Sequence, residues 1–450
     1  MKETRHARPG RDRKAHLSAD AERLVAAALG LASALAGCGG APGQETATPA
    51  DAAPVDAVSD ADWVRSVMTQ TYLYAERMPA ADLSGTTDAA RALEALRVNP
   101  PDRFSYVERR DRYEAFFDEG RSVGLGIALR IEADRLRLRL VQPQSPAGRA
   151  GLRRGDAIVS IDDAPVAGLI AARAVDDAFG PAEAGRIVRL GVERDGVRRE
   201  VVLEKAEYPL AAVLATRVIE RPGGLVGYVA LYAFVEPARA AWAEALAALR
   251  AAGARRLVVD LRDNGGGRLN VAAEIAAALA PPSAIGQPFT ELRHNARRAG
   301  DDRTIRVPEQ PLAGGFEQVA WLVSDVTCSA SESLIAGLRP YRDDPVIGTR
   351  TCGKPVGAEP QVRGDLLLSL LTFATRNRDG LTDWFDGLAP TCAVADEPYL
   401  PLGDPADPRL AEALRRLETG HCGDTTAKSV ERDGGAAPAS SGLTRETGLH

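Results

Sequence analysis

Lysine is almost absent from this chain. Only five of its 56 basic residues are lysine, namely Lys2, Lys14, Lys205, Lys354 and Lys428, and the others are arginine. Arginine therefore serves wherever a positive charge alone is needed. A lysine in the folded part of the chain is expected to do something that arginine cannot, because only lysine readily gives up its proton at accessible pH.

Histidine is equally scarce, with five residues: His6, His16, His294, His421 and His450. A zinc site built from imidazoles needs two or three of them to converge, so this class of site is nearly excluded. His6 and His16 precede any plausible mature start. A Ser-His-Asp triad could therefore draw only on His294 and His421.

The chain also lacks an excess of positive charge. Its net charge of −6 gives no support to nucleic-acid binding through bulk electrostatics. Its 450 residues predict two or three domains. Apolar residues form 45% and charged residues 26% of the sequence, which indicates a largely globular chain rather than a fibrous one.

The N-terminus has the pattern of an export signal. A basic stretch precedes LVAAALGLASALAGC, which ends at Cys38 and is too short to span a bilayer. It resembles a bacterial lipoprotein signal, which implies removal of residues 1–37, a lipid on Cys38 and a flexible tether over 38–60. The alternative is an ordinary secretory signal. The resemblance implies anchoring in the cell envelope facing the periplasm, and Gly39 favours the outer membrane.

Export changes the interpretation of the cysteines, because cysteines pair in an oxidising compartment. If Cys38 carries lipid, Cys328, Cys352, Cys392 and Cys422 remain, and they allow three pairings. We favour Cys392–Cys422, worth about 3 kcal/mol. That choice leaves Cys328 with Cys352. Free thiols are the alternative, and the spacing fits no zinc knuckle.

The pattern along the chain divides it into regions. An amphipathic repeat predicts a helical N-terminal region over 61–119. Alternating apolar residues, with a hairpin turn at RDGVR, predict a strand-rich region over 120–206. Residues 207–425 alternate strand-like and helical runs, which predicts an α/β region with a mostly parallel sheet. The polar, breaker-rich tail over 426–450 is predicted to be disordered.

The strand-rich region contains the loop Gly124-Leu125-Gly126-Ile127 before a strand. Such a loop can present backbone N–H groups to a terminal carboxylate, while the sheet edge beside it accepts an extended peptide. With SPAGRAGLRRGDAIVSID behind it, the region resembles a PDZ domain. A small β-barrel without a ligand is the alternative.

Two motifs of the α/β region could carry nucleophilic chemistry. In TCSASE, Ser329 and Glu332 have the spacing of a helix capping box, but a serine at a strand-to-helix turn can also expose its hydroxyl for attack. Lys354 lies in GTRTCGKPVG, a loop punctuated by glycine and proline. It could be a surface lysine, although surface cations here are almost always arginine. Desolvation would make its amine neutral and able to accept a serine proton.

A third motif is the run DLRDNGGG from Asp260 to Gly267. It could be a glycine-rich phosphate turn, but it matches neither the dinucleotide fingerprint nor the P-loop. Glycines also let backbone N–H groups point at a carbonyl oxygen, as an oxyanion hole requires.

Together, the three motifs, the segment DRFSYV and the PDZ-like region resemble the C-terminal-processing, or tail-specific, serine peptidases with a Ser–Lys dyad. The resemblance implies a multidomain α+β fold with a small helical N-terminal region, a PDZ-like β domain and an α/β crotonase-like (ClpP-like) catalytic domain. It also implies that Ser329 is the nucleophile, Lys354 the general base, and the amides of Gly267 and Ala330 the oxyanion hole.

The same resemblance gives supporting roles to Asp260 and Arg262, which would hold the glycine loop. Glu332 would orient the lysine or cap the helix, and we favour the cap. Many members carry a glutamine four residues after the lysine, where this chain has Ala358. This difference leaves reduced or atypical catalysis open.

The sequence thus predicts an exported, membrane-anchored serine endopeptidase whose PDZ domain binds a protein or peptide substrate near its C-terminus. It predicts no metal, no cofactor and no nucleic-acid partner. A catalytically silent peptide- or ligand-binding lipoprotein of the same fold is the alternative. An acyl-transfer or CoA-type enzyme is a further one, but no basic cluster that could hold phosphate supports it.

Overall fold

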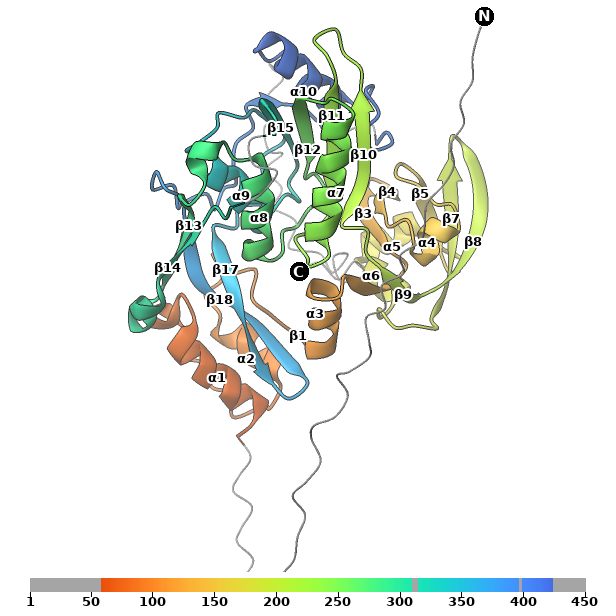
Figure 1. Ribbon diagram of the computed structural model, residues 1–450. Helices are drawn as coiled ribbons and strands as arrows, with labels where there is room; N and C mark the ends of the chain where they lie inside the picture. Colours follow the sequence, from red (N-terminus) through yellow and green to blue (C-terminus); the bar gives the residue numbers. More distant parts are fainter. Residues whose placement is uncertain (1–57, 310–314, 396–398, 424–450) are drawn as a thin grey trace, which may run out of the picture. The chain divides into compact units, whose positions relative to one another are not determined.

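The computed structural model describes residues 58–309, 315–395 and 399–423 (Figure 1). Cys38, the predicted signal, most of the predicted tether and the predicted disordered tail lie outside these residues. Among the residues described, no helix combines the length and the apolar character needed to cross a bilayer.

The N-terminal region is helical, as its amphipathic pattern predicts. Its helices are α1 (Asp60–Thr71), η1 (Ala75–Arg77), α2 (Ala89–Leu96) and α3 (Arg110–Phe117). Ser59 begins α1 by accepting a hydrogen bond from the amide of Asp62. The apolar face of α1 and α2 packs on strand residues Leu368 and Leu371, far along the chain.

The strand-rich region forms a six-stranded antiparallel sheet. Its order is β3-β4-β5-β7-β8, with β6 on β5. The strands are β3 (Ile127–Glu132), β4 (Arg135–Val141), β5 (Ala157–Ile161), β6 (Ala164–Pro165), β7 (Ile187–Arg194) and β8 (Val197–Glu204). Helices α4 (Pro146–Arg149), α5 (Val166–Ala172) and α6 (Val175–Phe179) accompany them, and β2 (Arg121–Gly124) pairs with β9 (Ala206–Pro209). Asp195 and Gly196, both at positive φ, form the predicted hairpin turn.

The α/β region is built on a second six-stranded sheet in the order β10-β11-β12-β15-β16-β19. Its strands are β10 (Val213–Ile219), β11 (Val226–Leu231), β12 (Arg256–Asp260), β15 (Gln318–Val323), β16 (Val346–Gly348) and β19 (Cys392–Ala393). Only the β10–β11 pair is antiparallel within the described sheet, so the predicted mostly parallel sheet is confirmed.

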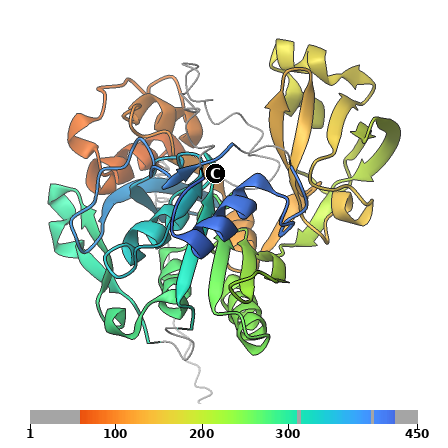
Figure 2. The ribbon, with the colours of Figure 1, turned by 90° about the horizontal axis from the view of Figure 1, so that it is seen from above.

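Helices cover both faces of this sheet (Figure 2). One face packs against α7 (Ala238–Ala251), α8 (Leu269–Leu279) and α9 (Ala330–Leu338). The other face packs against α10 (Pro408–Thr419). The strands are buried on both sides, which explains their continuous apolar runs.

An antiparallel sheet that no sequence pattern predicted brings together strands from residues 106–109 and 288–376. It consists of β1 (Tyr106–Arg109), β13 (Pro288–His294), β14 (Arg303–Arg306), β17 (Val356–Arg363) and β18 (Leu366–Arg376). The short helices η2 (Pro282–Ala284) and η3 (Ala296–Asp301) flank β13. Because β1 pairs with β18, the helical N-terminal region is attached directly to the α/β region.

The parallel strand order brings together the loops that follow β12, β15 and β16, which contain the three sequence motifs. Strands β12, β15 and β16 are neighbours and parallel, so their carboxyl ends meet at one sheet edge. The hydroxyls of Ser324 and Thr327, which follow β15, donate to the carbonyls of Arg262 and Leu261, which follow β12. These bonds hold the loop that leads to Ser329 against the loop that leads to Gly267.

Candidate active site

Ser329 lies at the turn between β15 and α9 in a strained conformation, with φ 54° and ψ −114°. A non-glycine residue at positive φ is uncommon, and it is typical of positions held by their surroundings for function. The neighbouring residues are fixed by one carbonyl, because the amide of Cys328 and the hydroxyl of Ser331 both donate to the oxygen of Asn264. This turn corresponds to the predicted strand-to-helix position.

The glycine loop lies directly against Ser329. A Cβ on Gly266 would come within 2.9 Å of the Ser329 Cβ, so no larger residue fits there. Gly267 has φ 140°, and its chain neighbours form a bridge with Phe234 through the carbonyl of Gly266 and the amide of Arg268. The bridge therefore does not use the Gly267 amide.

Ala330 offers the second predicted donor. It is the first residue of α9, so its amide has no carbonyl in the preceding helical turn. The amide of Gly266, in contrast, is committed to the Asn264 side chain at 2.9 Å. The positions of Gly267 and Ala330 are therefore compatible with the oxyanion hole that the family resemblance implies.

Glu332 connects the nucleophile loop with the lysine loop. Its Oε2 accepts the amide of Ser329 at 3.0 Å and the amide of Lys354 at 2.8 Å. Its Oε1 accepts the amide of Gly353 at 2.9 Å and the hydroxyl of Thr351 at 2.5 Å. This carboxylate therefore caps α9, as the capping-box spacing predicts, and also fixes the loop that carries Lys354.

The Glu332 side chain is fully buried. Burial raises the pKa of its carboxyl, while the hydrogen bonds from Thr351, Lys354, Gly353 and Ser329 oppose that rise. A carboxylate that accepts four donors has its lone pairs occupied. The capping-box spacing predicted only the bond to Ser329, because the other three donors lie about 20 residues further along the chain.

Lys354 follows in the loop between β16 and β17. Its Nζ lies 5.0 Å from the centre of the Phe104 ring, and the carbonyl of nearby Cys352 accepts a hydrogen bond from Arg103 at 2.7 Å. Burial lowers the pKa of Lys354 to about 8, although the carboxylates of Asp102 and Glu332 partly oppose this effect. A lysine with this pKa is partly neutral near physiological pH, as a general base requires.

A disulfide joins the two loops. Cys328 and Cys352 are bonded, with 5.2 Å between their Cα atoms, and Cys392 is bonded to Cys422. The structure therefore contains the pairing that we favoured. The two clusters of possible metal ligands within the described residues are these cysteine pairs, each with a glutamate. In both clusters the sulfurs are bonded to each other and are not thiolates.

The base of the glycine loop contains a buried ion network. Arg262 binds Asp260 on one side and Asp407 on the other, both at 2.7 Å, and Tyr228 donates to Asp260 at 2.6 Å. Although burial would raise the pKa of Asp260, the guanidinium of Arg262 keeps it below its usual range. Asp407 also caps α10 through the amide of Arg409. These contacts agree with a structural role for Asp260 and Arg262.

The strand-rich region contacts the same loop. Arg139 and Arg154 form ion pairs with Asp263 at 3.2 and 3.0 Å, and all three side chains are largely buried. Within this region, Gly124 ends β2 and Ile127 begins β3, which is an edge strand of its sheet. The loop containing Leu125 and Gly126 therefore lies where a PDZ domain would bind a carboxylate.

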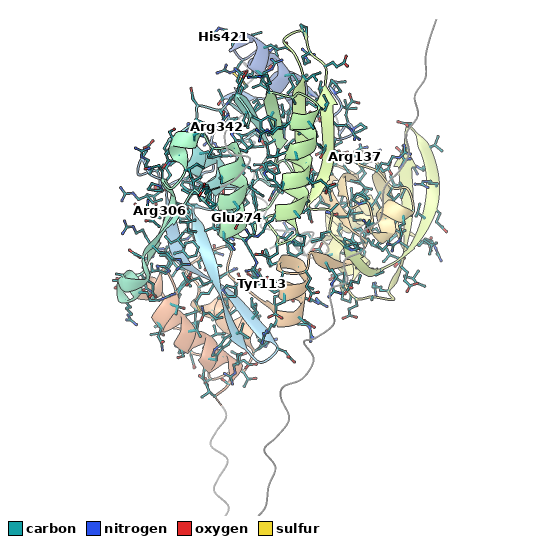
Figure 3. All side chains as sticks on the ribbon, viewed as in Figure 1. Tyr113, Arg137, Glu274, Arg306, Arg342 and His421 are labelled. Carbon is teal, nitrogen blue, oxygen red and sulfur yellow. A yellow bond between two sulfur atoms is a disulfide. The ribbon has the colours of Figure 1, made fainter. Side chains whose placement is uncertain are left out.

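Neither histidine of the described residues forms a hydrogen bond with Ser329. His294 contacts Asp302 through its ring at 3.3 Å, and its side chain is fully buried. His421 is exposed just beyond the end of α10 (Figure 3). The arrangement gives no support to a histidine triad.

Three residues near Lys354 carry no sequence motif of their own that indicates a role in this site. Asp102, Arg103 and Phe104 belong to the segment DRFSYV, which contributed to the family resemblance only as a pattern. They reach the lysine loop from a position about 250 residues earlier in the chain. No local signal could have indicated this contact.

Three family comparisons cover much of the chain. Residues 225–394 match peptidase family S41, residues 123–204 match the PDZ domain, and residues 61–106 match the peptidase S41 N-terminal domain.

Among curated proteins, the carboxy-terminal processing protease CtpB of Bacillus subtilis is 27% identical over 323 residues, which cover 69% of this chain and 64% of CtpB. The carboxyl-terminal-processing protease of Synechocystis is 28% identical over 290 residues, which cover 63% of this chain and 65% of that protein. The chain thus spans slightly less than two thirds of the length of these relatives.

Solved structures share the fold. A putative S41 protease from Bacteroides fragilis has a TM-score of 0.64 at 22% identity, over 80% of this chain and 97% of that one. The photosystem II D1 C-terminal processing protease has a TM-score of 0.51 at 21% identity, over 78% of this chain and 98% of that one. The multidomain α+β fold with a PDZ domain is therefore confirmed.

Proposed function

Because this chain belongs to peptidase family S41 and carries a PDZ domain, we propose that it is a serine endopeptidase with a Ser329–Lys354 dyad. One observation supports the dyad above all others. The backbone amides of Ser329 and Lys354 donate to the same oxygen of Glu332, so nucleophile and base are held on one anchor.

In the proposed reaction, neutral Lys354 accepts the hydroxyl proton of Ser329 as its oxygen attacks the scissile carbonyl carbon. The amides of Gly267 and Ala330 stabilise the negative charge that develops on the carbonyl oxygen. The C–N bond then breaks, and the lysine ammonium returns the proton to the leaving amine. Water attacks the resulting ester with the same base, which releases the acid and restores the serine.

The substrate is an extended polypeptide. The edge strand β3 can add a peptide strand, and the loop at residues 124–127 can bind a terminal carboxylate. Both curated relatives are named as processing proteases of carboxyl termini, which supports cleavage near that end of the substrate.

We further propose that the mature chain is exported and anchored through a lipid on Cys38. The support comes from the signal pattern before Cys38 and from the two disulfides, which persist in oxidising compartments. The proposed location of the mature chain is the outer membrane, with the folded part facing the periplasm.

Mass spectrometry of the peptides released by the wild-type protein and by Ser329→Ala tests the peptidase assignment. The wild type should release fragments that Ser329→Ala does not. Lys354→Arg should also be inactive, because arginine keeps the charge but cannot act as a base. If a fluorophosphonate probe leaves Ser329 unlabelled and no fragments form, the silent peptide-binding alternative, which Ala358 keeps open, replaces the proposal.

A further inference from the structure

We propose that Phe104, in the helical N-terminal region, is a positioning residue for Lys354 that stabilises its ammonium form through the face of its ring. This inference rests on the proposed function, since it takes Lys354 as the base. It makes the N-terminal region part of the catalytic apparatus rather than a lead-in to the PDZ domain.

A buried carboxylate holds Phe104 in place. Asp102 accepts the hydroxyl of Tyr72 at 2.8 Å, the hydroxyl of Ser105 at 2.7 Å and the amides of Phe104 and Ser105 at 2.9 Å. The Ser105 hydroxyl in turn accepts the amide of Leu371 in β18. The loop that presents the ring is therefore tied to α1 and to the antiparallel sheet.

The same loop is tied to the lysine loop. Arg103 donates to the carbonyl of Cys352, two residues before Lys354. The Lys354 amide is fixed by Glu332, while its Nζ lies 5.0 Å from the Phe104 ring centre. Among the described residues, this ring is the one direct contact of the Lys354 ammonium.

An aromatic face attracts a cation and has no such preference for a neutral amine. Burial acts in the opposite direction and disfavours the ammonium. The carboxylates that act on Lys354 are those of Asp102 and Glu332, and each is already occupied by four donors. The guanidinium of Arg103 also lies over the Phe104 ring, 4.8 Å from its centre, so the ring contacts two cationic side chains. The ring is thus the contact that can strengthen as the lysine takes the serine proton, which lowers the barrier to that transfer.

The lysine content of the chain provides a test that needs no activity. With 13C-labelled lysine, the full-length protein gives signals from only five lysines, and Lys354→Arg identifies the one of interest. We expect Phe104→Leu to lower the pKa of Lys354 by roughly 0.5–1 unit. Phe104→Tyr should leave it near the wild-type value, because the ring is retained.

A matched control comes from another part of the chain. Arg378 lies over the Tyr341 ring, 5.3 Å from its centre, so Tyr341→Leu removes a similar contact and should leave the Lys354 pKa unchanged. Fluorinated phenylalanine at position 104 withdraws electron density from the ring with little change in shape. It should lower the pKa stepwise with each fluorine, even if Phe104→Leu does not fold.

Catalysis should change in parallel. We expect Phe104→Leu to lower kcat about 3–30-fold, with KM and Tm nearly unchanged. The acidic limb of the pH profile, which reports the deprotonation of Lys354, should shift to lower pH together with its pKa. An unchanged or raised pKa in the leucine and fluorinated variants overturns the proposal, as does an equal shift in Tyr341→Leu. If the pKa moves as expected but the wild type cleaves no peptide, the contact stands and the peptidase assignment fails.

Discussion

The backbone amides of Ser329 and Lys354 meet at one oxygen atom, the Oε2 of Glu332, at 3.0 and 2.8 Å. Because both bonds are made by backbone amides, they fix the backbone positions of Ser329 and Lys354 whatever rotamers the two side chains adopt. Glu332 of the TCSASE motif therefore caps the helix and also holds the loop that carries Lys354. A single buried carboxylate sets the separation of the proposed nucleophile and base.

Glu332→Gln tests this anchor. The amide NH₂ of glutamine cannot accept hydrogen bonds, so about two of the four donors lose their acceptor in a buried site. We expect a stability loss of about 2–4 kcal/mol and a roughly 100-fold fall in kcat. Urea unfolding and peptide cleavage measure the two effects. Glu317→Gln, which breaks an exposed pair with Arg255, should leave both stability and kcat nearly unchanged.

Activity should increase with pH through the titration of Lys354. Burial places its pKa at about 8, and only the neutral amine can accept the serine proton. We expect kcat/KM to rise about tenfold per pH unit below 7 and to level off above 9. The profile is measured between pH 6 and 10 on a peptide without ionisable side chains. A midpoint near 6.5 would instead indicate a histidine and would contradict the dyad.

Lys354→Met should stabilise the protein while abolishing cleavage. The lysine has an ordinary pKa of 10.5 and a pKa of about 8 in the folded chain, so below pH 8 the fold carries a partly buried, desolvated cation at a cost. As pH rises from 8 to 10.5 the folded state gives up this proton first, and the cost is relieved. Methionine should therefore raise Tm most below pH 8, by a margin that shrinks toward pH 10.5. Lys354→Arg, which keeps the charge, should give no such gain.

Removing each disulfide in turn should distinguish its effect on stability from its effect on catalysis. They close loops of similar length, with sequence separations of 24 and 30, so each is expected to stabilise the fold by about 3–4 kcal/mol. Removing Cys328–Cys352 as a double serine variant should also lower kcat at least tenfold, because it joins the nucleophile and base loops.

Removing Cys392–Cys422 in the same way should lower Tm by a similar amount and leave kcat at the permissive temperature unchanged. Equal kcat in the two double variants would show that Glu332 alone holds the loops together. Calorimetry and single-turnover cleavage distinguish these outcomes.

The scarcity of lysine had a physical meaning at both lysines that the structure describes. Lys205 is fully buried and donates to the carbonyls of Gly180 and Pro181 at 3.0 and 3.1 Å, a task that suits a compact ammonium better than a broad guanidinium. Lys354 has the lowered pKa that the composition argument required. For Lys205 the reason for lysine is the size of the ammonium and not proton transfer.

The sequence by itself determined the elements whose signals are local. The buried parallel strands, the hairpin turn at Asp195-Gly196, the helix start at Ser329 and the glycine loop all follow from patterns within about ten residues. The order of these motifs also carried the family resemblance. Local backbone preference and apolar periodicity depend on neighbouring residues, so they can be predicted directly from the sequence.

Only the tertiary structure decided which distant groups meet. The β1–β18 pairing, the four donors on Glu332 and the contact of Phe104 with Lys354 join residues up to about 260 positions apart. Such contacts depend on how the sheets and helices pack, and no local pattern encodes them. The sequence therefore indicated the serine and the lysine of the proposed dyad, while the packing of the N-terminal region placed Phe104 and Arg103 beside the lysine loop.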